Sequence, residues 1–442
     1  MSTTAKEWAL GPGEELRFEV SFKKTVEVRL KSGHAEYFGT ELGPEATYRF
    51  SGENGAIFSW QGCALLVSGE YESAYVAGET PMDTFVNVHM GLQQQRVQAR
   101  NESNANSAPR VLIVGPEDSG KTSLARILLN YAVRMGETPV FASLDPMEAT
   151  VSMPSTISAV SVSKTIDIES GFMGYAASSS HGVPETPLVW QFGHEQPEDN
   201  SSLFNVLVDH LSSSVSKRFE ADKFAAGSGI VVDTRGFSDV AHNKTIEHAV
   251  DALQINTLLV VGNERMFSMY SSKFGSRLRV LKLPRTGGAV DRSAMYRQQL
   301  NSRTIRQYFY GTETEKVSSF STVVNFQEIK ILRVGEDSVA PSSTLPLGED
   351  RKVTDTTVLT VEPDESLIHS ILAVTDAPMG TTGEDKMDVD SESQVVGIQA
   401  IGFINVTKVE MDKKRMIVLS PVPGRLPKQV LLYGNAKWME TV

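Results

Sequence analysis

The sequence predicts a multidomain α/β protein with an N-terminal all-β domain, a central domain built on a parallel sheet, and a C-terminal domain of strands with one helix. Short alternating strands fill the first part of the chain, strands alternate with helices after Pro109, and a glycine-rich loop follows the first central strand. The length of 442 residues agrees, because a chain of this size usually forms two to four domains.

The composition excludes several classes of protein. A net charge of −12 argues against broad nonspecific binding to nucleic acid, which needs an excess of lysine and arginine, although it allows a local basic groove. Cys63 is the only cysteine, so no internal disulfide can form, and we interpret it as a core residue of a strand and not a nucleophile. The N-terminus lacks an apolar signal core and no apolar run approaches ~18 residues, so we expect a soluble, intracellular protein with no membrane segment.

The N-terminal domain is expected at residues 1–97. From Leu16 onward apolar residues alternate with polar ones, and glycines separate short strands at intervals of about 8–12 residues, which is typical of a small sandwich or barrel. A helix is expected from about Met82 to Val97. The polar sequence that follows cannot contribute to a core, so we interpret residues 98–108 as a linker.

The central domain is expected at residues 109–314. Apolar strands alternate here with helices, which indicates βαβ units and a mostly parallel sheet buried on both faces. The C-terminal domain then occupies residues 315–442, with a helix expected at Ser366–Val374 among its strands. Residues 376–394 are rich in acids and poor in bulky side chains, which predicts a disordered acidic loop.

The stretch GPEDSGKT at 115–122 matches the phosphate-binding pattern G-x-x-x-x-G-K-[ST], between an apolar strand and an apolar-periodic helix. The two glycines permit a close backbone approach, and the amides at the helix start point at a position where the helix dipole favours an anion. The lysine can reach the outer phosphates and the threonine hydroxyl can ligate Mg²⁺. The sequence therefore predicts a nucleotide site formed by Gly115, Asp118, Ser119, Gly120, Lys121, Thr122 and Ser123.

Asp145 and Asp233 each end an apolar strand. Because ligands of parallel sheets bind beyond the carboxyl ends of the strands, either carboxylate can lie beside the phosphates. There it would orient a Mg²⁺-bound water or accept a proton from an attacking hydroxyl. The alternative for both is a helix cap or a turn. We favour the functional interpretation for Asp145, while for Asp233 both interpretations stay open.

Residues 291–311 carry arginines at helical intervals, which are Arg292, Arg297, Arg303 and Arg306. Phosphoryl transfer often uses an arginine that closes over the γ-phosphate. The alternative is a helix with a solvated basic face, and the residues alone favour neither interpretation. The eight histidines form no zinc-binding motif.

Motifs along nearly the whole chain occur in a distinctive order. After the phosphate loop come VWQFG at 189–193, VVDTRGF at 231–237, IRQYFYG at 305–311 and SPVPGRLPK at 420–428. This order resembles the Clp family of eukaryotic polyribonucleotide 5′-hydroxyl kinases, whose members serve in pre-mRNA 3′-end cleavage and polyadenylation. The resemblance implies an N-terminal β-sandwich, a central P-loop domain related to the SIMIBI NTPases and a C-terminal α/β domain.

The resemblance also implies ATP and Mg²⁺ in the central domain. In the family the N-terminal domain touches the nucleotide base, and the matching positions here are Glu15 and Asn54, the latter standing where relatives commonly carry lysine. Arg292 and Arg297 match the lid that closes on the phosphates. The implied catalytic set is Lys121, Asp145, Arg292 and Arg297, with Thr122 and Asp145 on the metal.

The acceptor side of the site departs from the active relatives. Asp145 to Glu148 read DPME in place of Asp-x-Gly-Gln, Gln191 replaces a histidine, and Phe237 replaces a tryptophan proposed to stack on the RNA end. These changes affect placement of the acceptor far more than ATP binding. Fungal members are similarly altered, so we favour an ATP-loaded nuclear scaffold bound to other subunits of cleavage factor IA, with indirect contact to pre-mRNA. The alternative is an active kinase that transfers the γ-phosphate to an RNA 5′-hydroxyl.

Overall fold

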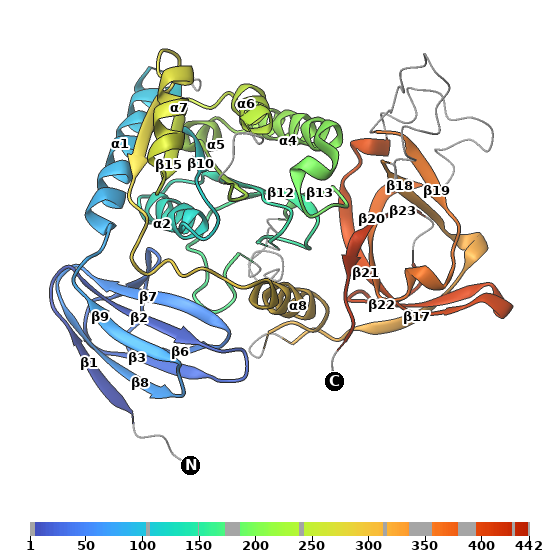
Figure 1. The fold of residues 1–442 in the computed structure, drawn as a ribbon, viewed down its shortest axis with the longest axis horizontal. Helices are drawn as coiled ribbons and strands as arrows, with labels where there is room; N and C mark the ends of the chain where they lie inside the picture. The colour runs from blue at the N-terminus through green and yellow to red at the C-terminus, as the bar shows by residue number, and fades with distance from the viewer. Residues whose placement is uncertain are drawn as a thin grey trace.

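The computed structural model describes residues 5–102, 107–148, 150–172, 186–237, 243–312, 316–335, 356–378, 395–426 and 429–440. An N-terminal β-sandwich, a central α/β domain and a C-terminal domain dominated by one sheet follow one another along the chain (Figure 1). The multidomain fold expected from the sequence is thus confirmed. Among the described residues, no helix combines the length and apolar character needed to cross a membrane.

The N-terminal domain is a sandwich of two antiparallel sheets, with strand orders β5-β4-β7-β2-β9 and β1-β8-β3-β6. The alternating residues Leu16, Phe18 and Val20 are buried between the sheets, and Cys63 is a buried free thiol, as interpreted. The strands are β1 (Lys6–Leu10), β2 (Glu14–Val20), β3 (Val26–Gly33), β4 (Glu36–Tyr37), β5 (Thr40–Glu41), β6 (Thr47–Phe50), β7 (Glu53–Ser59), β8 (Cys63–Gly69) and β9 (Ser73–Ala77).

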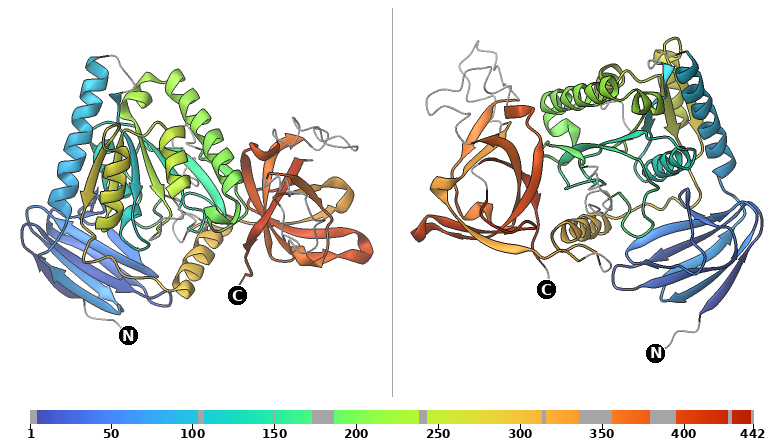
Figure 2. Two further views of the ribbon diagram at one scale, coloured as in Figure 1. Left: turned by 45° about the horizontal axis from the view of Figure 1, so that its top comes forward. Right: turned by 180° about the vertical axis from the view of Figure 1, so that it is seen from behind.

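Helix α1 (Met82–Asn101) leaves the sandwich and runs along the side of the central domain (Figures 1 and 2). It continues into residues that we expected to form the linker. The Arg96 side chain explains part of this, because it is buried against the central domain and its Nε donates to the Ser228 carbonyl over 3.0 Å. Residues 103–106 of the expected linker lie outside the described part of the chain.

The central sheet has seven strands in the order β13-β12-β11-β14-β10-β15-β16. Five are parallel, while β12 and β13 run antiparallel at one edge. We did not predict β12 or β16, because the first carries small polar residues and the second is a partly exposed edge strand with charges. The strands are β10 (Arg110–Val114), β11 (Val140–Leu144), β12 (Thr156–Ser161), β13 (Leu188–Gln191), β14 (Ile230–Thr234), β15 (Thr257–Val261) and β16 (Arg279–Leu283).

Helices cover both faces of this sheet. Val111 and Ile113 of β10 pack under α1 and α2, whereas Leu112 and Val114 face the opposite layer of helices. Such two-sided burial is the reason that the strands read as continuous apolar runs. The helices are α2 (Lys121–Arg134) on the first face and α4 (Ser201–Ala221), α5 (Lys223–Ser228), α6 (Asn243–Ala252) and α7 (Glu264–Phe274) on the second.

The C-terminal domain is built on a seven-stranded sheet in the order β17-β22-β21-β20-β23-β18-β19. The helix expected at Ser366–Val374 is wrong, because the chain forms a short 3-10 turn and then β20. Ile371, Leu372 and Ala373 are all buried, so this strand lacks the alternation that identifies one. Residues 379–394, most of the expected acidic loop, lie outside the described residues. The strands are β17 (Phe320–Asn325), β18 (Lys330–Val334), β19 (Val358–Val361), β20 (Ser370–Pro378), β21 (Ala400–Glu410), β22 (Arg415–Ser420) and β23 (Gln429–Lys437).

Helix α8 (Ala294–Tyr310) is formed by the arginine-rich segment and contacts all three domains. The Tyr296 hydroxyl donates to the Gly52 carbonyl of the sandwich over 3.1 Å, and the Asn301 amide donates to the Met147 carbonyl of the central domain over 2.9 Å. At the other end, the Phe309 ring stacks on Trp438 with 5.8 Å between centroids. The arginines of this helix are therefore held at a junction of domains.

Candidate functional site

A cleft of about 330 Å³ opens where the sandwich, the phosphate loop and the α8 segment meet. Its volume lies at the lower end of the range for small-molecule sites. Gly115 is not among its lining residues but lies at the start of the loop. The predicted site residues that line the cleft are Glu15, Asn54, Asp118, Ser119, Gly120, Lys121, Thr122, Ser123, Asp145, Arg292 and Arg297.

The phosphate loop has the backbone that its sequence predicts. β10 ends at Val114 and α2 begins at Lys121, with Gly120 at the N-cap in the left-handed region at φ 90°. Within the described ranges no side chain caps the N-terminus of α2, so its first amides can bind an anion. A Cβ on Gly115 would lie 2.6 Å from the Val261 carbonyl oxygen, so only glycine fits there.

Lys121 is buried inside its own loop. Its Nζ donates to the Pro116 carbonyl over 2.8 Å, and the same oxygen accepts from the Ser119 hydroxyl over 2.9 Å. Burial lowers the pKa of Lys121, and the nearby Asp233, Asp145 and Glu148 carboxylates act in the opposite direction. A phosphate in the loop would therefore compete for this ammonium with one carbonyl oxygen and a cluster of acids.

The Thr122 hydroxyl donates to Asp233 Oδ2 over 2.6 Å. Burial raises the pKa of Asp233 to about 6, and Lys121 and Thr122 act against that rise. The second carboxylate oxygen, Oδ1, is buried with no hydrogen-bond partner among the described residues. A threonine hydroxyl beside an orphaned carboxylate oxygen is a donor set that suits Mg²⁺.

Asp145 belongs to the same acid cluster and lines the cleft. Burial, followed by Glu148 and Asp233, raises its pKa to about 7. Its Oδ1 accepts from the Met147 amide over 2.9 Å, which is the turn role that we kept as the alternative. A carboxylate with such a pKa is suited to accepting a proton near neutral pH.

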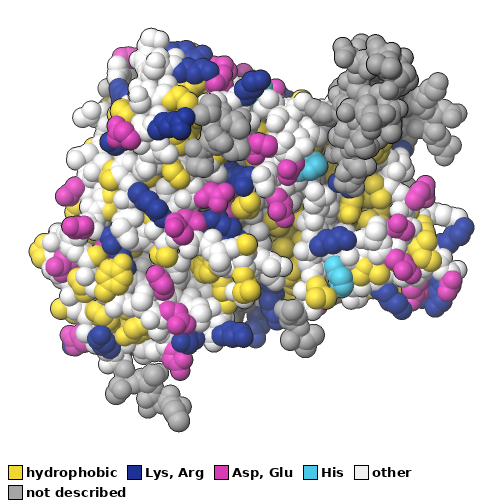
Figure 3. Space-filling model, viewed as in Figure 1, with side chains coloured by type: hydrophobic (Ala, Val, Ile, Leu, Met, Phe, Trp, Pro, Cys, Tyr) yellow, Lys and Arg dark blue, Asp and Glu magenta, His cyan; other side chains and the backbone are white. Residues whose placement is uncertain are grey.

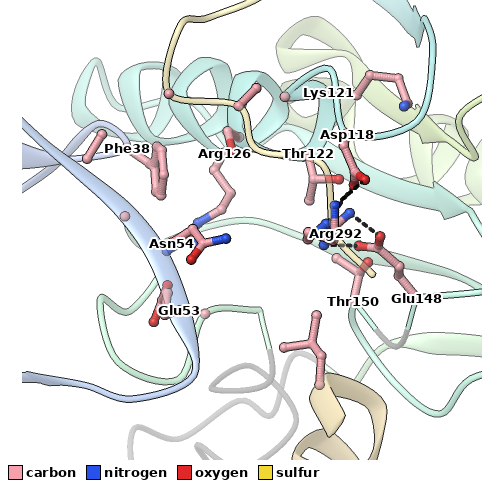
Figure 4. Close-up of a pocket in the computed structure, with 18 of the residues that line it drawn as sticks. Phe38, Glu53, Asn54, Asp118, Lys121, Thr122, Arg126, Glu148, Thr150 and Arg292 are labelled. Atoms are coloured by element: carbon pink, nitrogen blue, oxygen red, sulfur yellow. Dashed lines mark hydrogen bonds and ion pairs between the residues drawn. The ribbon is translucent and has the colours of Figure 1, made fainter. Parts of the chain in front are cut away.

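Arg292 and Arg297 are bound by two carboxylates and do not form a solvated basic face. Arg292 donates to Asp118 from its amide over 2.8 Å and from Nε over 2.7 Å, and its terminal nitrogens contact Glu148 (Figure 4). Arg297 donates to Asp118 over 2.6 Å and to Glu148 over 3.0 Å. Burial acts to raise the pKa of Asp118, but the Arg292 backbone and guanidinium hold it below its usual value.

The sandwich contributes the other wall of the cleft. Glu15 is buried, and its carboxylate accepts from Arg17 Nε over 2.5 Å and from the Thr80 hydroxyl over 2.9 Å. Asn54 at the start of β7 projects into the cleft from the sandwich side (Figure 4). Sequence reasoning overlooked Arg126 on α2, which extends toward Asn54. The sequence feature that could have identified Arg126 is its position as a charged residue within the apolar stretch LARILL.

Three side chains of the motifs VWQFG and VVDTRGF lie in the protein interior. Trp190 and Phe237 are both buried in the main core of the central domain. Gln191 is buried as well. Trp190 and Phe237 therefore contribute to core packing.

Family models match the chain in the order of its three domains. The N-terminal beta-sandwich domain of polyadenylation factor matches residues 9–99, the P-loop of mRNA cleavage and polyadenylation factor CLP1 matches 115–311, and pre-mRNA cleavage complex II protein Clp1 matches 317–440.

Full-length relatives carry two kinds of name at the same similarity. The mRNA cleavage and polyadenylation factor CLP1 of Phaeosphaeria nodorum is 36% identical, covering 100% of this chain and 94% of the relative. The polyribonucleotide 5′-hydroxyl-kinase Clp1 of Danio rerio is also 36% identical, covering 96% and 92%. A protein CLP1 homolog of Nematostella vectensis is 36% identical, covering 99% and 98%. Overall identity thus does not distinguish a processing factor from a kinase.

The fold is shared with a solved structure. Clp1p in a wild-type Clp1p–Pcf11p complex superposes with a TM-score of 0.85 at 24% identity, covering 100% of both chains. This likeness shows that the two chains share the fold over their whole length.

Proposed function

The chain belongs to the CLP1 family of mRNA cleavage and polyadenylation factors, and from this premise we propose that it is an ATP-binding subunit of a pre-mRNA cleavage complex. It would be required for the endonucleolytic cleavage that is coupled to polyadenylation. In this proposal the protein holds Mg²⁺ and ATP as a structural ligand and acts in the nucleus as a scaffold for other subunits.

The observation that carries this proposal is the pairing of both lid arginines. Arg292 and Arg297 are neutralised by Asp118 and Glu148, while the amides of the phosphate loop stay uncapped. Arginines that stabilise phosphoryl transfer must direct their positive charge at the negative charge of the transferred phosphoryl group. Here carboxylates already compensate the charge of both arginines. The site therefore favours binding a triphosphate over transferring its γ-phosphate.

The position of the cleft explains how a held nucleotide would act. The lining residues come from the sandwich, the central domain and the α8 segment, so one ligand contacts all of these parts. A ligand bound only by the native state stabilises it by ~4 kcal/mol at a thousandfold excess over Kd. ATP would therefore fix the relative positions of domains that a partner recognises. When bound, Mg²⁺ would supply positive charge beside Thr122 and Asp233.

The surface is consistent with protein partners. Lysine and arginine are interspersed with acids over the face in Figure 3, and the chain as a whole is acidic. Broad binding to nucleic acid needs an excess of positive charge. Since a similar fold was solved as Clp1p with Pcf11p, we propose a partner of that type within cleavage factor IA and indirect contact with pre-mRNA.

A second candidate function is the 5′-hydroxyl kinase. Asp145 supports it, because a carboxylate with a pKa of about 7 near the phosphate loop is suited to deprotonating an acceptor hydroxyl. In that reaction Asp145 would take the proton of the RNA hydroxyl, and Lys121 with a lid arginine would stabilise the phosphates.

The decisive experiment identifies the nucleotide released when the purified full-length protein is denatured. We expect intact ATP by mass spectrometry. Released diphosphate, together with label transfer from ATP to a 5′-hydroxyl RNA that Asp145→Ala abolishes, would favour the kinase. Protein that carries no nucleotide and binds none with Mg²⁺ would contradict both functions.

A further inference from the structure

Arg126 occupies a distinctive place on α2. Its guanidinium lies over the rings of Tyr37 and Phe38, with centroid distances of 5.4 and 5.1 Å. It extends from the helix that begins in the phosphate loop to Asn54 on the sandwich wall of the cleft (Figure 4). The side chain therefore spans the space between the phosphate-binding part of the site and the N-terminal domain.

Two nitrogens of the Arg126 guanidinium lack a hydrogen-bond partner among the residues that the structure describes. These are Nε and Nη2, and both are buried. The other arginines that line the cleft have protein partners. Arg292, Arg297 and Arg235 each contact a carboxylate, and Arg303 donates to the carbonyls of Ser51 and Gly52. Buried charged donors are costly to leave unpaired, so an orphaned guanidinium in a cleft indicates an acceptor that a ligand supplies.

The chemistry of the guanidinium limits what that acceptor can be. Arginine carries five N–H donors and no acceptor, and its flat face is already used by the aromatic rings. Its edge therefore needs an acceptor atom, such as a phosphate oxygen, a ring nitrogen, a carbonyl oxygen or a sugar oxygen. Its position beside Asn54 on the sandwich wall favours the acceptors of the nucleoside. Asn54 stands beside Arg126 as a neutral amide (Figure 4). In this chain the cationic donor at that wall is Arg126.

We propose that Arg126 donates hydrogen bonds to the nucleoside of the bound triphosphate and determines how tightly the nucleoside, as opposed to the phosphates, is held. The inference rests on the proposed function in one respect only, namely that a nucleotide occupies the phosphate loop. It adds a contact from α2 to those expected from Glu15 and Asn54.

The test compares Mg·ATP with Mg·tripolyphosphate by calorimetry on the full chain. For Arg126→Met we expect ATP affinity to fall about ten- to hundredfold, the effect of losing charge-assisted hydrogen bonds, with tripolyphosphate affinity unchanged. Arg126→Lys keeps the charge but loses the fork and should give a smaller loss for ATP alone. It also serves if the methionine variant does not fold. Arg134→Met is the matched control on the same helix, because Arg134 pairs with Glu36 and Glu41 and does not line the cleft.

Each result decides the matter. Equal loss for both ligands would place Arg126 on the phosphates and overturn the inference. Unchanged affinity for both would reduce Arg126 to packing against Tyr37 and Phe38, which also overturns it. A wild-type chain that binds neither ligand would instead contradict the proposed function itself.

Discussion

The Thr122 hydroxyl and the Asp233 carboxylate are joined by a hydrogen bond of 2.6 Å, so the start of α2 and the end of β14 meet directly. This pairing leaves one buried carboxylate oxygen without a partner among the described residues. The sequence favoured Asp145 as the metal residue with Thr122, and that assignment stays a prediction. The geometry makes Asp233 a second candidate, because it contacts Thr122 directly, although Asp145 and not Asp233 lines the cleft.

Asp233→Asn should weaken Mg²⁺-dependent binding of ATP about ten- to hundredfold, because it removes the charge beside Thr122 but keeps an oxygen for its hydrogen bond. Binding of ATP in EDTA should change little. Calorimetry with and without Mg²⁺ measures both effects. Asp145→Asn is the matched comparison, and a larger Mg²⁺-specific loss in that variant would assign the metal to Asp145.

Asp145 should make stability depend on pH. Its pKa is raised to about 7 in the folded chain, above the ordinary value of 3.8, so the folded state binds the proton more tightly than the unfolded state. This contribution to stability is complete below pH ~4 and is lost as pH rises through ~7. Asp145→Asn cannot ionise, so its stability relative to wild type should increase between pH 5 and 8 by on the order of 2 kcal/mol. Denaturant titrations of nucleotide-free protein test this, and a pH-independent difference would contradict the raised pKa.

The phosphate loop was predictable because its signal is local. The strand, the glycines, Lys121 and the apolar helix lie within about twenty consecutive residues, and each element supports the others. β20 was not predictable for the opposite reason. Ile371 and Leu372 point to opposite faces of a sheet that is covered on both sides, so the apolar run has no period that separates a strand from a helix.

The carboxylate partners of the lid illustrate what local patterns miss. Arg292 is 174 residues from Asp118 and 144 residues from Glu148, and only the tertiary fold brings the three together. The sequence identified the arginines from their helical spacing but gave no indication of their partners. The sequence analysis noted Glu148 only because it ends the stretch DPME, where the resemblance implies Asp-x-Gly-Gln.

Glu148→Gln should release the lid arginines toward a bound triphosphate. The substitution removes one negative charge beside the phosphate loop, so we expect ATP affinity to rise roughly tenfold. Glu264→Gln is the control for loss of one negative charge, because Glu264 pairs with Lys282 on the surface and does not line the cleft, so ATP affinity should not change. Unchanged or weaker binding in Glu148→Gln would mean that Glu148 only secures the fold of the lid.

Lys121→Ala should abolish nucleotide binding and, as a consequence, weaken binding of the partner subunit. The Lys121 ammonium is the buried positive charge at the centre of the loop, so its removal should abolish the stabilisation of ~4 kcal/mol expected at a thousandfold excess of ATP over Kd. Melting curves with and without Mg·ATP measure that loss, and capture of a Pcf11-type subunit should fall in parallel. Lys273→Ala is the control, because Lys273 pairs with Glu247 on the surface, away from the cleft. If the Lys121 variant binds no ATP yet captures the partner like wild type, the nucleotide does not organise the partner surface and the scaffold proposal loses its physical basis.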